Sequence, residues 1–445
     1  MNAVATRTPV GAIGGEGLVL AEEPGDPSQA LTRAYTGYLA DTCRHFFAVE
    51  NEIAPAQIGS YAEIAALVRD LLARRRGPVL ACFASPAVSA AIRCADLRGE
   101  VDAFGERIDL AVSEMMPHLL LELALRGLIP QGRSILWQHG SPRLASLATG
   151  GELIAPAGAS GLRFSASHIA AVAGDGELAR IEARREAMAG LPADGGADEF
   201  RFERCYWPLG GVTHLATIDR NPIAEFEAHP DKAGNHIDLG GRPRREWVEM
   251  LDGCFELVES FMPGELAEMK RVLQQAIPVG YDDHRHLSAS YREAVGTIYL
   301  TLHPSVMIMA EALVHEFQHN KFNVAAYSAE FLTNAFYPLF KSPVRPDPRP
   351  LWGIMLAVHA FLPVAELYRR MREGGHPLAQ HPDFERRMSE IDLKNHEGME
   401  MLRANAQLTP AGRAMMDDLE RLERAHLSDR IARGLENTPT SIHLA

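Results

Sequence analysis

Cysteine is scarce in this chain. The 445 residues include only five cysteines, which are scattered and show no CxxC spacing: Cys43, Cys82, Cys94, Cys205 and Cys254. An odd, unclustered set argues against a disulfide framework, an iron–sulfur cluster or a cysteine zinc site. The amino terminus lacks the basic start and apolar core of a signal peptide, and no run of eighteen apolar residues predicts a membrane span. We therefore expect a cytoplasmic protein.

Positive charge is also in short supply. The chain has 44 Lys and Arg against 58 Asp and Glu, a net charge of −14. This balance argues against general nucleic-acid binding and against binding to an anionic membrane surface. The apolar fraction of 47% is that of an ordinary globular protein, and the length allows two or three domains. Composition does not indicate an oligomeric state.

The hydrophobic patterning predicts an α+β protein that is predominantly helical. Residues 1–130 are typical of a helical N-terminal domain after a loose arm with one short strand at 18–20, and peptide recognition is our hypothesis for this domain. Short segments bounded by Gly, Pro and Ser make 131–245 a small mixed β and loop region, with one helix expected at 175–185. Residues 246–445 are expected to form a helical domain that binds a metal.

The most informative stretch is the H-E-x-x-H pentapeptide His315-Glu316-Phe317-Gln318-His319. It lies in an apolar, helix-compatible run that follows Pro304 and Ser305, where a helix is expected to begin. Residues four apart lie on one helix face, so the two imidazoles can share one metal ion. Glu316 is displaced about 100° around the axis, beside the metal. The alternative is a buried helix whose histidines bond to nearby backbone or carboxylates.

A catalytic metal site needs a further protein ligand. The candidates are His359, Glu366, Glu316 and the pair His284 and His286. The first two share a face of a helix expected over 351–373, and the pair alternates on a predicted strand. Each has a simpler explanation, because a lone histidine on an apolar helix is usually a core residue and Glu366 can pair with Arg370. Ala325 stands where metzincin-type proteases carry their third histidine, which argues against that class.

Two pairs of polar residues are candidates for binding a small ligand. Arg345 and Arg349 flank a proline-rich loop, and guanidinium groups on stiff backbone suit bidentate recognition of a carboxylate. The alternative is that both pair with Asp347. Ser288 and Ser290 alternate on one face of a predicted strand and could hold a small polar ligand, or could be plain edge residues.

Four ordered segments together resemble a known family. They are 287–290 (LSAS), 296–300 (GTIYL), 313–319 (LVHEFQH) and 345–351 (RPDPRPL). The family is the HEXXH-motif domain found beside genes for ribosomally synthesised and post-translationally modified peptides. The resemblance covers roughly residues 200–425 and is sharpest over 286–363. The chain departs from the family pattern in one respect, because the later helix carries Leu356 where the family often has histidine, and His359 follows one turn later.

The resemblance implies an iron(II), 2-oxoglutarate-dependent oxygenase that uses O₂ to hydroxylate a β-carbon of a residue in a precursor peptide. It implies that His315 and His319 are iron ligands, and the third ligand is His359 from a shifted turn or a residue elsewhere. It also implies that Arg345 and Arg349 hold the 2-oxoglutarate carboxylate. Glu316 would then be a ligand or a neighbour of the metal.

Two other functions fit the residues. In a zinc metallopeptidase, Glu316 would be the general base, and Glu366 or His359 would complete the site. A protein that binds peptides without catalysing a reaction is the third alternative.

Overall fold

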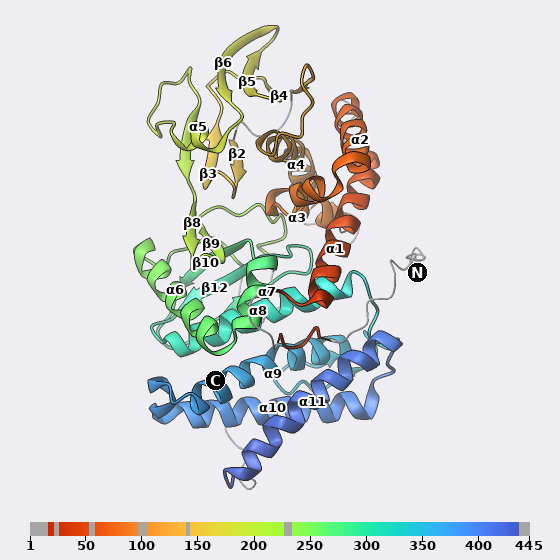
Figure 1. The fold of residues 1–445 in the computed structure, drawn as a ribbon, viewed down its shortest axis with the longest axis vertical. Helices are drawn as coiled ribbons and strands as arrows, with labels where there is room; N and C mark the ends of the chain where they lie inside the picture. Colours follow the sequence, from red (N-terminus) through yellow and green to blue (C-terminus); the bar gives the residue numbers. More distant parts are fainter. Residues whose placement is uncertain are drawn as a thin grey trace. The chain divides into compact units, whose positions relative to one another are not determined.

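The structure is a computed structural model that describes residues 17–21, 26–52, 58–95, 97, 105–138, 143–226 and 234–435. In this part of the chain, helices account for most of the regular structure and the strands form several small sheets (Figure 1). The predicted class, α+β and mostly helical, is confirmed at that level.

The chain divides into two compact units, each assembled from separated stretches. Unit 1 takes the chain up to Tyr38, Glu249–Val272 and the residues from His303 onwards, and unit 2 takes Leu39–Val248 and Leu273–Leu302. The units therefore do not follow the three consecutive segments 1–130, 131–245 and 246–445. Two helices, α1 (Gln29–Ala48) and α6 (Arg244–Phe261), pass from one unit into the other.

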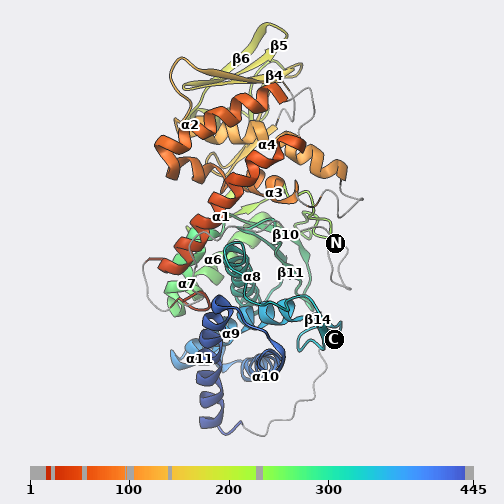
Figure 2. The same ribbon diagram turned by 90° about the vertical axis from the view of Figure 1, so that its right-hand side faces the viewer.

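Unit 2 includes a group of three helices, the last of which packs against the other two (Figure 2). They are α2 (Ile58–Cys82), α3 (Pro86–Ala95) and α4 (Gly105–Leu125). Pro86 occupies the first helical position, where its fixed φ favours the helix and its missing N–H removes no bond. Met115, Leu119 and Leu120 of α4 are fully buried in this helical layer.

An antiparallel sheet with the order β1-β4-β5-β6 follows. Its strands are β1 (Ser134–Trp137), β4 (Gly161–Ser165), β5 (His168–Ala173) and β6 (Gly176–Glu182), and the short helix α5 is Arg185–Ala189. The helix predicted at 175–185 is wrong, because this segment is the second strand of a hairpin. Gly174 makes the turn at φ 55°, a conformation that glycine adopts without a steric penalty.

Two further sheets complete unit 2. One has the order β2-β3-β7, with β2 (Arg143–Ser146), β3 (Gly151–Ile154) and β7 (Arg201–Arg204). The other has the order β11-β12-β10-β9-β8, with β8 (Tyr206–Leu209), β9 (Thr213–Ala216), β10 (Gln275–Tyr281), β11 (Ser288–Ala289) and β12 (Thr297–Leu302). Strand β10 runs parallel to both β9 and β12, and these central strands are largely buried.

Unit 1 is a layer of helices around α9, which packs against α8, α10 and α11 (Figure 1). Its helices are α7 (Pro263–Val272), α8 (Val306–Ala326), α9 (Leu351–Glu373), α10 (Pro382–Asn405) and α11 (Pro410–Ala432), with the 3₁₀ turn Pro377–Gln380. Strands β13 (Leu339–Phe340) and β14 (Arg349–Pro350) form a small antiparallel pair. Helix α10 approaches α9 closely at Gly398, where an added Cβ would lie 2.5 Å from Val358 Cγ2.

The segment Gly17–Ala21 is a buried part of unit 1 and not a loose arm. Leu18 and Val19 are almost fully buried, and this segment is not a strand, in contrast to the prediction at 18–20. Its backbone bonds to three separate helices: Gly17 N–H donates to Asp418 Oδ2 (2.7 Å), Ala21 N–H to Glu265 Oε1 (2.6 Å), and Leu18 O accepts from His359 Nε2 (2.9 Å). The segment therefore ties α7, α9 and α11 together.

Helix α9 is the one straight helix in the described part of the chain with the length and apolar composition to cross a membrane. Most of its apolar window, 78%, is buried inside the protein, as expected for a core helix. The helix pair Ile58–Cys82 and Pro86–Ala95 meets the same test only if taken together, and it is bent by 97°.

Candidate metal centre

The pentapeptide lies in the middle of α8, which starts where the sequence predicts. Pro304 and Ser305 precede the helix, and Ser305 is extended, although its side chain does not cap the helix. Nearly every residue of α8 from Met309 onwards is buried, whereas His315 and His319 are partly exposed. Beyond the first turn of α8, the two histidines are thus the positions of this core helix that reach toward solvent.

His315, Glu316 and His319 form a compact donor group. Their ligand atoms all lie within 4.8 Å of one another. The two imidazole rings have centroids 4.4 Å apart and planes 80° apart, and the Glu316 side chain is almost fully buried beside them. Ligands about 2.0–2.2 Å from one metal ion lie roughly 3 Å apart, so small side-chain rotations would bring this group around one cation.

The electrostatics of the group favour a neutral, metal-binding histidine. Burial lowers the pKa of His319, and the neighbouring Glu316 carboxylate opposes this shift. A neutral imidazole is the form that coordinates metals. The His319 Nδ1 atom is buried and has no hydrogen-bond partner in the described part of the chain. Two imidazoles and one carboxylate on one helical turn therefore fit a divalent transition metal.

His359 lies outside this group, in contrast to the expectation that it is the third ligand. It is fully buried on α9, and its Nε2 bonds to the carbonyl oxygen of Leu18. Because a carbonyl only accepts, Nε2 carries the proton. Burial lowers the pKa of His359 to about 3, with a further contribution from the Lys321 charge. The segment around Leu18, distant in sequence, makes His359 a neutral core residue.

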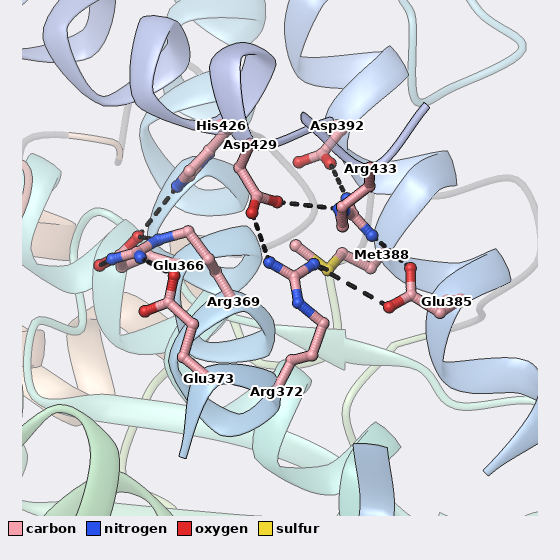
Figure 3. Close-up of polar contacts among 10 residues, drawn as sticks. All are labelled: Glu366, Arg369, Arg372, Glu373, Glu385, Met388, Asp392, His426, Asp429 and Arg433. Carbon is pink, nitrogen blue, oxygen red and sulfur yellow. Dashed lines mark hydrogen bonds and ion pairs between the residues drawn. The ribbon is translucent and has the colours of Figure 1, made fainter. Parts of the chain in front are cut away.

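Glu366 is also outside the group, and it has the simpler role that its spacing suggested. It accepts hydrogen bonds from Arg369 (2.6 and 2.8 Å), Arg370 (2.5 Å) and His426 (3.1 Å), as Figure 3 shows in part. Burial alone would raise the pKa of Glu366, yet the bonds from His426 and the two arginines hold it well below its usual range. It therefore connects α9 to α11 as a structural anion.

The pair His284 and His286 and the serines Ser288 and Ser290 belong to unit 2, whereas the donor group belongs to unit 1. His284 is largely exposed, and Asp282 Oδ1 accepts from the backbone N–H groups of His284 and Arg285. The acidic turn thus caps its own backbone. Of the predicted strand, only Ser288–Ala289 forms one, in β11.

Arg345 and Arg349 both form salt bridges with the carboxylate of Asp347, which lies between them in the sequence. Arg345 Nε lies 2.9 Å from Asp347 Oδ1, and Arg349 Nε lies 2.9 Å from Asp347 Oδ2. Burial acts to raise the pKa of Asp347, but the bond from Arg345 and the two positive charges lower it. The pairing with Asp347 is the alternative that the spacing left open. Both guanidinium groups are about three-quarters buried, and the trio keeps a net positive charge.

A buried ionic cluster, which the sequence pattern did not predict, lies between α8 and α7, and its lysine follows His319 by two residues. Lys321 is completely buried, and its Nζ pairs with Glu265 Oε1 (3.2 Å) and with Glu268, both from α7. Gln318 Nε2 also donates to Glu265 Oε2 (2.8 Å). Burial raises the pKa of Glu265 to about 7, and the charge of Lys321 opposes this shift. The available signal was a lysine inside an apolar helical run.

This cluster fixes how α8 is rotated about its axis. Ala21 N–H donates to Glu265, and Ser28 N–H donates to Glu268 Oε1 (3.2 Å), so the same carboxylates also hold the amino-terminal segment. On the side of α9, the centroid of the His315 ring lies 4.3 Å from the centroid of the Phe361 ring. Contacts to two other helices therefore position the helix that carries His315 and His319.

No family model matches the chain, and no curated protein is significantly similar to it.

Proposed function

We propose that this protein is an iron(II), 2-oxoglutarate-dependent oxygenase that hydroxylates a β-carbon of a residue in a ribosomally made precursor peptide. The observation that carries the proposal is the compact group of His315, Glu316 and His319 on one turn of α8. The resemblance of the four ordered segments to the HEXXH-motif domain family supplies the cosubstrate and the substrate class.

Each residue of the group has a proposed role. His315 and His319 would hold iron(II), and Glu316 becomes the candidate third ligand because His359 and Glu366 are committed elsewhere. Two imidazoles and one carboxylate leave coordination positions open for a small molecule. The bound iron would supply the activation of O₂, which 2-oxoglutarate reduces as it decarboxylates to succinate and CO₂. One oxygen atom enters succinate, and the other enters the peptide C–H bond.

Arg345 and Arg349 remain our candidates for the distal carboxylate of 2-oxoglutarate. Their shared partner, Asp347, already shows that both groups can hold one carboxylate. A dicarboxylate would replace or join Asp347 in this clamp, and bidentate charge-assisted bonds would orient it.

A zinc metallopeptidase is the second candidate, because Glu316 lies within the same 4.8 Å group, where a general base is needed. The two functions differ in their dependence on 2-oxoglutarate and in the fate of the peptide.

The test uses the full-length protein purified metal-free and reloaded with iron(II) under O₂, together with 2-oxoglutarate and the peptide encoded by a neighbouring short reading frame. We expect succinate formation and a peptide that is heavier by about 16 Da, the mass of one oxygen atom. His315→Ala is expected to abolish both. If neither product forms with the wild-type protein, the oxygenase proposal is wrong. Peptide cleavage with zinc and without 2-oxoglutarate would instead identify a peptidase.

A further inference from the structure

Unit 2 contains a cavity of about 320 Å³ lined by both polar and apolar side chains, which is the size of a site for a small ligand. One wall is a face of α4, where Arg107, Ala111, Glu114 and His118 follow one another at intervals of three or four residues. The segment after β9, residues 219–222, lines it as well. All of the lining residues belong to unit 2.

Asp219 is held in a fixed orientation at this cavity. Its Oδ1 accepts from Asn221 N–H (2.9 Å), and its Oδ2 accepts from the hydroxyl of Tyr299 (2.8 Å), which is fully buried in β12. Asn221 Nδ2 in turn donates to the same hydroxyl (3.1 Å). Burial raises the pKa of Asp219 to about 6, so the carboxylate is ionised at pH 7.5. Its bonds come from neutral donors, and each oxygen can accept another bond.

The charges around the cavity leave an excess of negative charge. Arg220 is shared by two carboxylates, with Nη1 2.9 Å from Glu114 Oε2 and Nη2 2.8 Å from Glu152 Oε1. Arg107 and Glu225 neutralise each other. Asp219 forms no salt bridge with the residues that the structure describes. Glu152 does not line the cavity and also pairs with Arg143. Among the charged lining residues, three carboxylates face two guanidinium groups, so one net negative charge remains, and a cationic ligand group would balance it.

His118 does not supply that balancing charge. Its Nδ1 bonds to Glu114 O (2.7 Å), and its Nε2 accepts from Ala145 N–H (3.1 Å), so the ring is a neutral tautomer. Burial lowers the pKa of His118 to about 4, and the nearby Arg220 charge adds to the shift.

We propose that this cavity binds the protonated amino group of a small ligand, as found in a free amino acid amide or at the amino terminus of a peptide. The ammonium group bonds to Asp219, which is held in place by Asn221 and Tyr299. The exposed side chains of Leu110 and Ile237, which also line the cavity, contact an apolar part of the ligand. The proposal does not depend on the metal centre.

Isothermal titration calorimetry with the full chain at pH 7.5 tests the proposal. The probes are leucinamide, the tripeptide Leu-Ala-Ala amide and its N-acetylated form. We expect the probes with a free amino group to bind and the acetylated peptide to bind at least about tenfold more weakly, because it lacks the charge. Binding of leucinamide alone would assign the site to a free amino acid amide, and tighter binding of the tripeptide would assign it to a peptide terminus.

Two variants locate the binding. Asp219→Asn is expected to weaken binding about tenfold or more, whereas Glu177→Gln, which removes one negative charge from the exposed strand β6, is its matched control and should leave binding unchanged. Ala111→Phe fills the cavity from α4 without changing any charge and is expected to abolish binding, which covers the case in which Asp219→Asn does not fold. The proposal is overturned if no amine binds, if the acetylated peptide binds equally well, or if Ala111→Phe binds like the wild type.

Discussion

Helices α8 and α9 pack against each other, both are apolar core helices, and both carry histidine, yet their histidines have different surroundings. On α8, His315 and His319 are partly exposed and share a small space with Glu316. On α9, His359 is completely buried and bonds to a backbone carbonyl. The difference shows that helical spacing identifies a possible metal pair, whereas neighbours from other parts of the chain decide the role of a single histidine.

The largest expected effect is on metal affinity, which should fall when a histidine of α8 is replaced but not when His359 of α9 is replaced. His315→Ala and His319→Ala each remove one of the two imidazoles, and we expect iron(II) or cobalt(II) affinity to fall by about 100-fold or more. His359→Gln keeps a side-chain N–H for Leu18 O and is expected to retain metal binding. Equilibrium dialysis with metal analysis measures both. Loss of metal with His359→Gln at unchanged fold would return His359 to the ligand set.

Lys321→Met is expected to give the next largest effect, on stability. It leaves Glu265 and Glu268 buried without their cation, which costs about 3–5 kcal/mol in the free energy of unfolding. Urea unfolding measures the change. The triple variant Lys321→Met, Glu265→Gln, Glu268→Gln removes all three charges and should recover a large part of it. If the single variant is as stable as the wild type, the cluster does not position α8.

His359→Ala tests how much the buried histidine of α9 contributes to stability. It creates a cavity in the core and leaves Leu18 O without its donor, so we expect a loss of about 2–4 kcal/mol in the free energy of unfolding. His359→Gln, which retains a donor, should lose less. Equal losses in the two variants would show that the bond to Leu18 contributes little.

Asp392→Asn on α10 is expected to give the smallest effect, and one that depends on pH. Burial raises the pKa of Asp392 to about 6, although His426 and Arg433 oppose the shift. Neither of its oxygens has a hydrogen-bond partner within the described chain, and its ion pair with Arg433 is long, with 4.0 Å between Oδ2 and Nη2 (Figure 3). The folded state therefore holds this proton more tightly than the unfolded state. The contribution of Asp392 to the wild-type free energy of unfolding is fully present below about pH 4 and is lost as the pH rises through 6.

The Asn variant is neutral at every pH, so it should be more stable than the wild type by about 2–3 kcal/mol at pH 7 and nearly equal to it at pH 4. Urea unfolding at the two pH values measures the difference. Asp417→Asn, at an exposed position of α11, is the matched control and should change stability little at either pH. A gain for Asp392→Asn that is the same at both pH values would contradict the assignment.

Local signals predicted a large part of the fold. Pro304-Ser305 marked the start of α8. A comparable local signal precedes α11, where Thr409 Oγ1 accepts from Gly412 N–H and Pro410 is the first helical residue. The donor group was predictable for the same reason, because i and i+4 spacing is a local property. The hairpin of β5 and β6 was missed because helix-compatible residues after Gly174 pair with a neighbouring strand.

The remaining features depend on contacts between distant residues, which one sequence does not display. The bond from His359 to Leu18 joins residues 341 positions apart, and the pairing of Lys321 with Glu265 joins α8 to α7. A charged residue in an apolar run indicates that a partner must exist, but this signal does not point to one residue. Nothing in the local pattern identified which carboxylate it was.

The buried segment Gly17–Ala21 has a practical consequence for dissecting this chain. A fragment that starts near residue 246 would include the whole H-E-x-x-H helix and would look complete by sequence. It would nevertheless lack the main-chain groups that bond to His359, Glu265 and Asp418. During synthesis, these early residues must wait for α9 and α11 to emerge before their bonds can form, so unit 1 is completed only when stretches of chain far apart in the sequence come together.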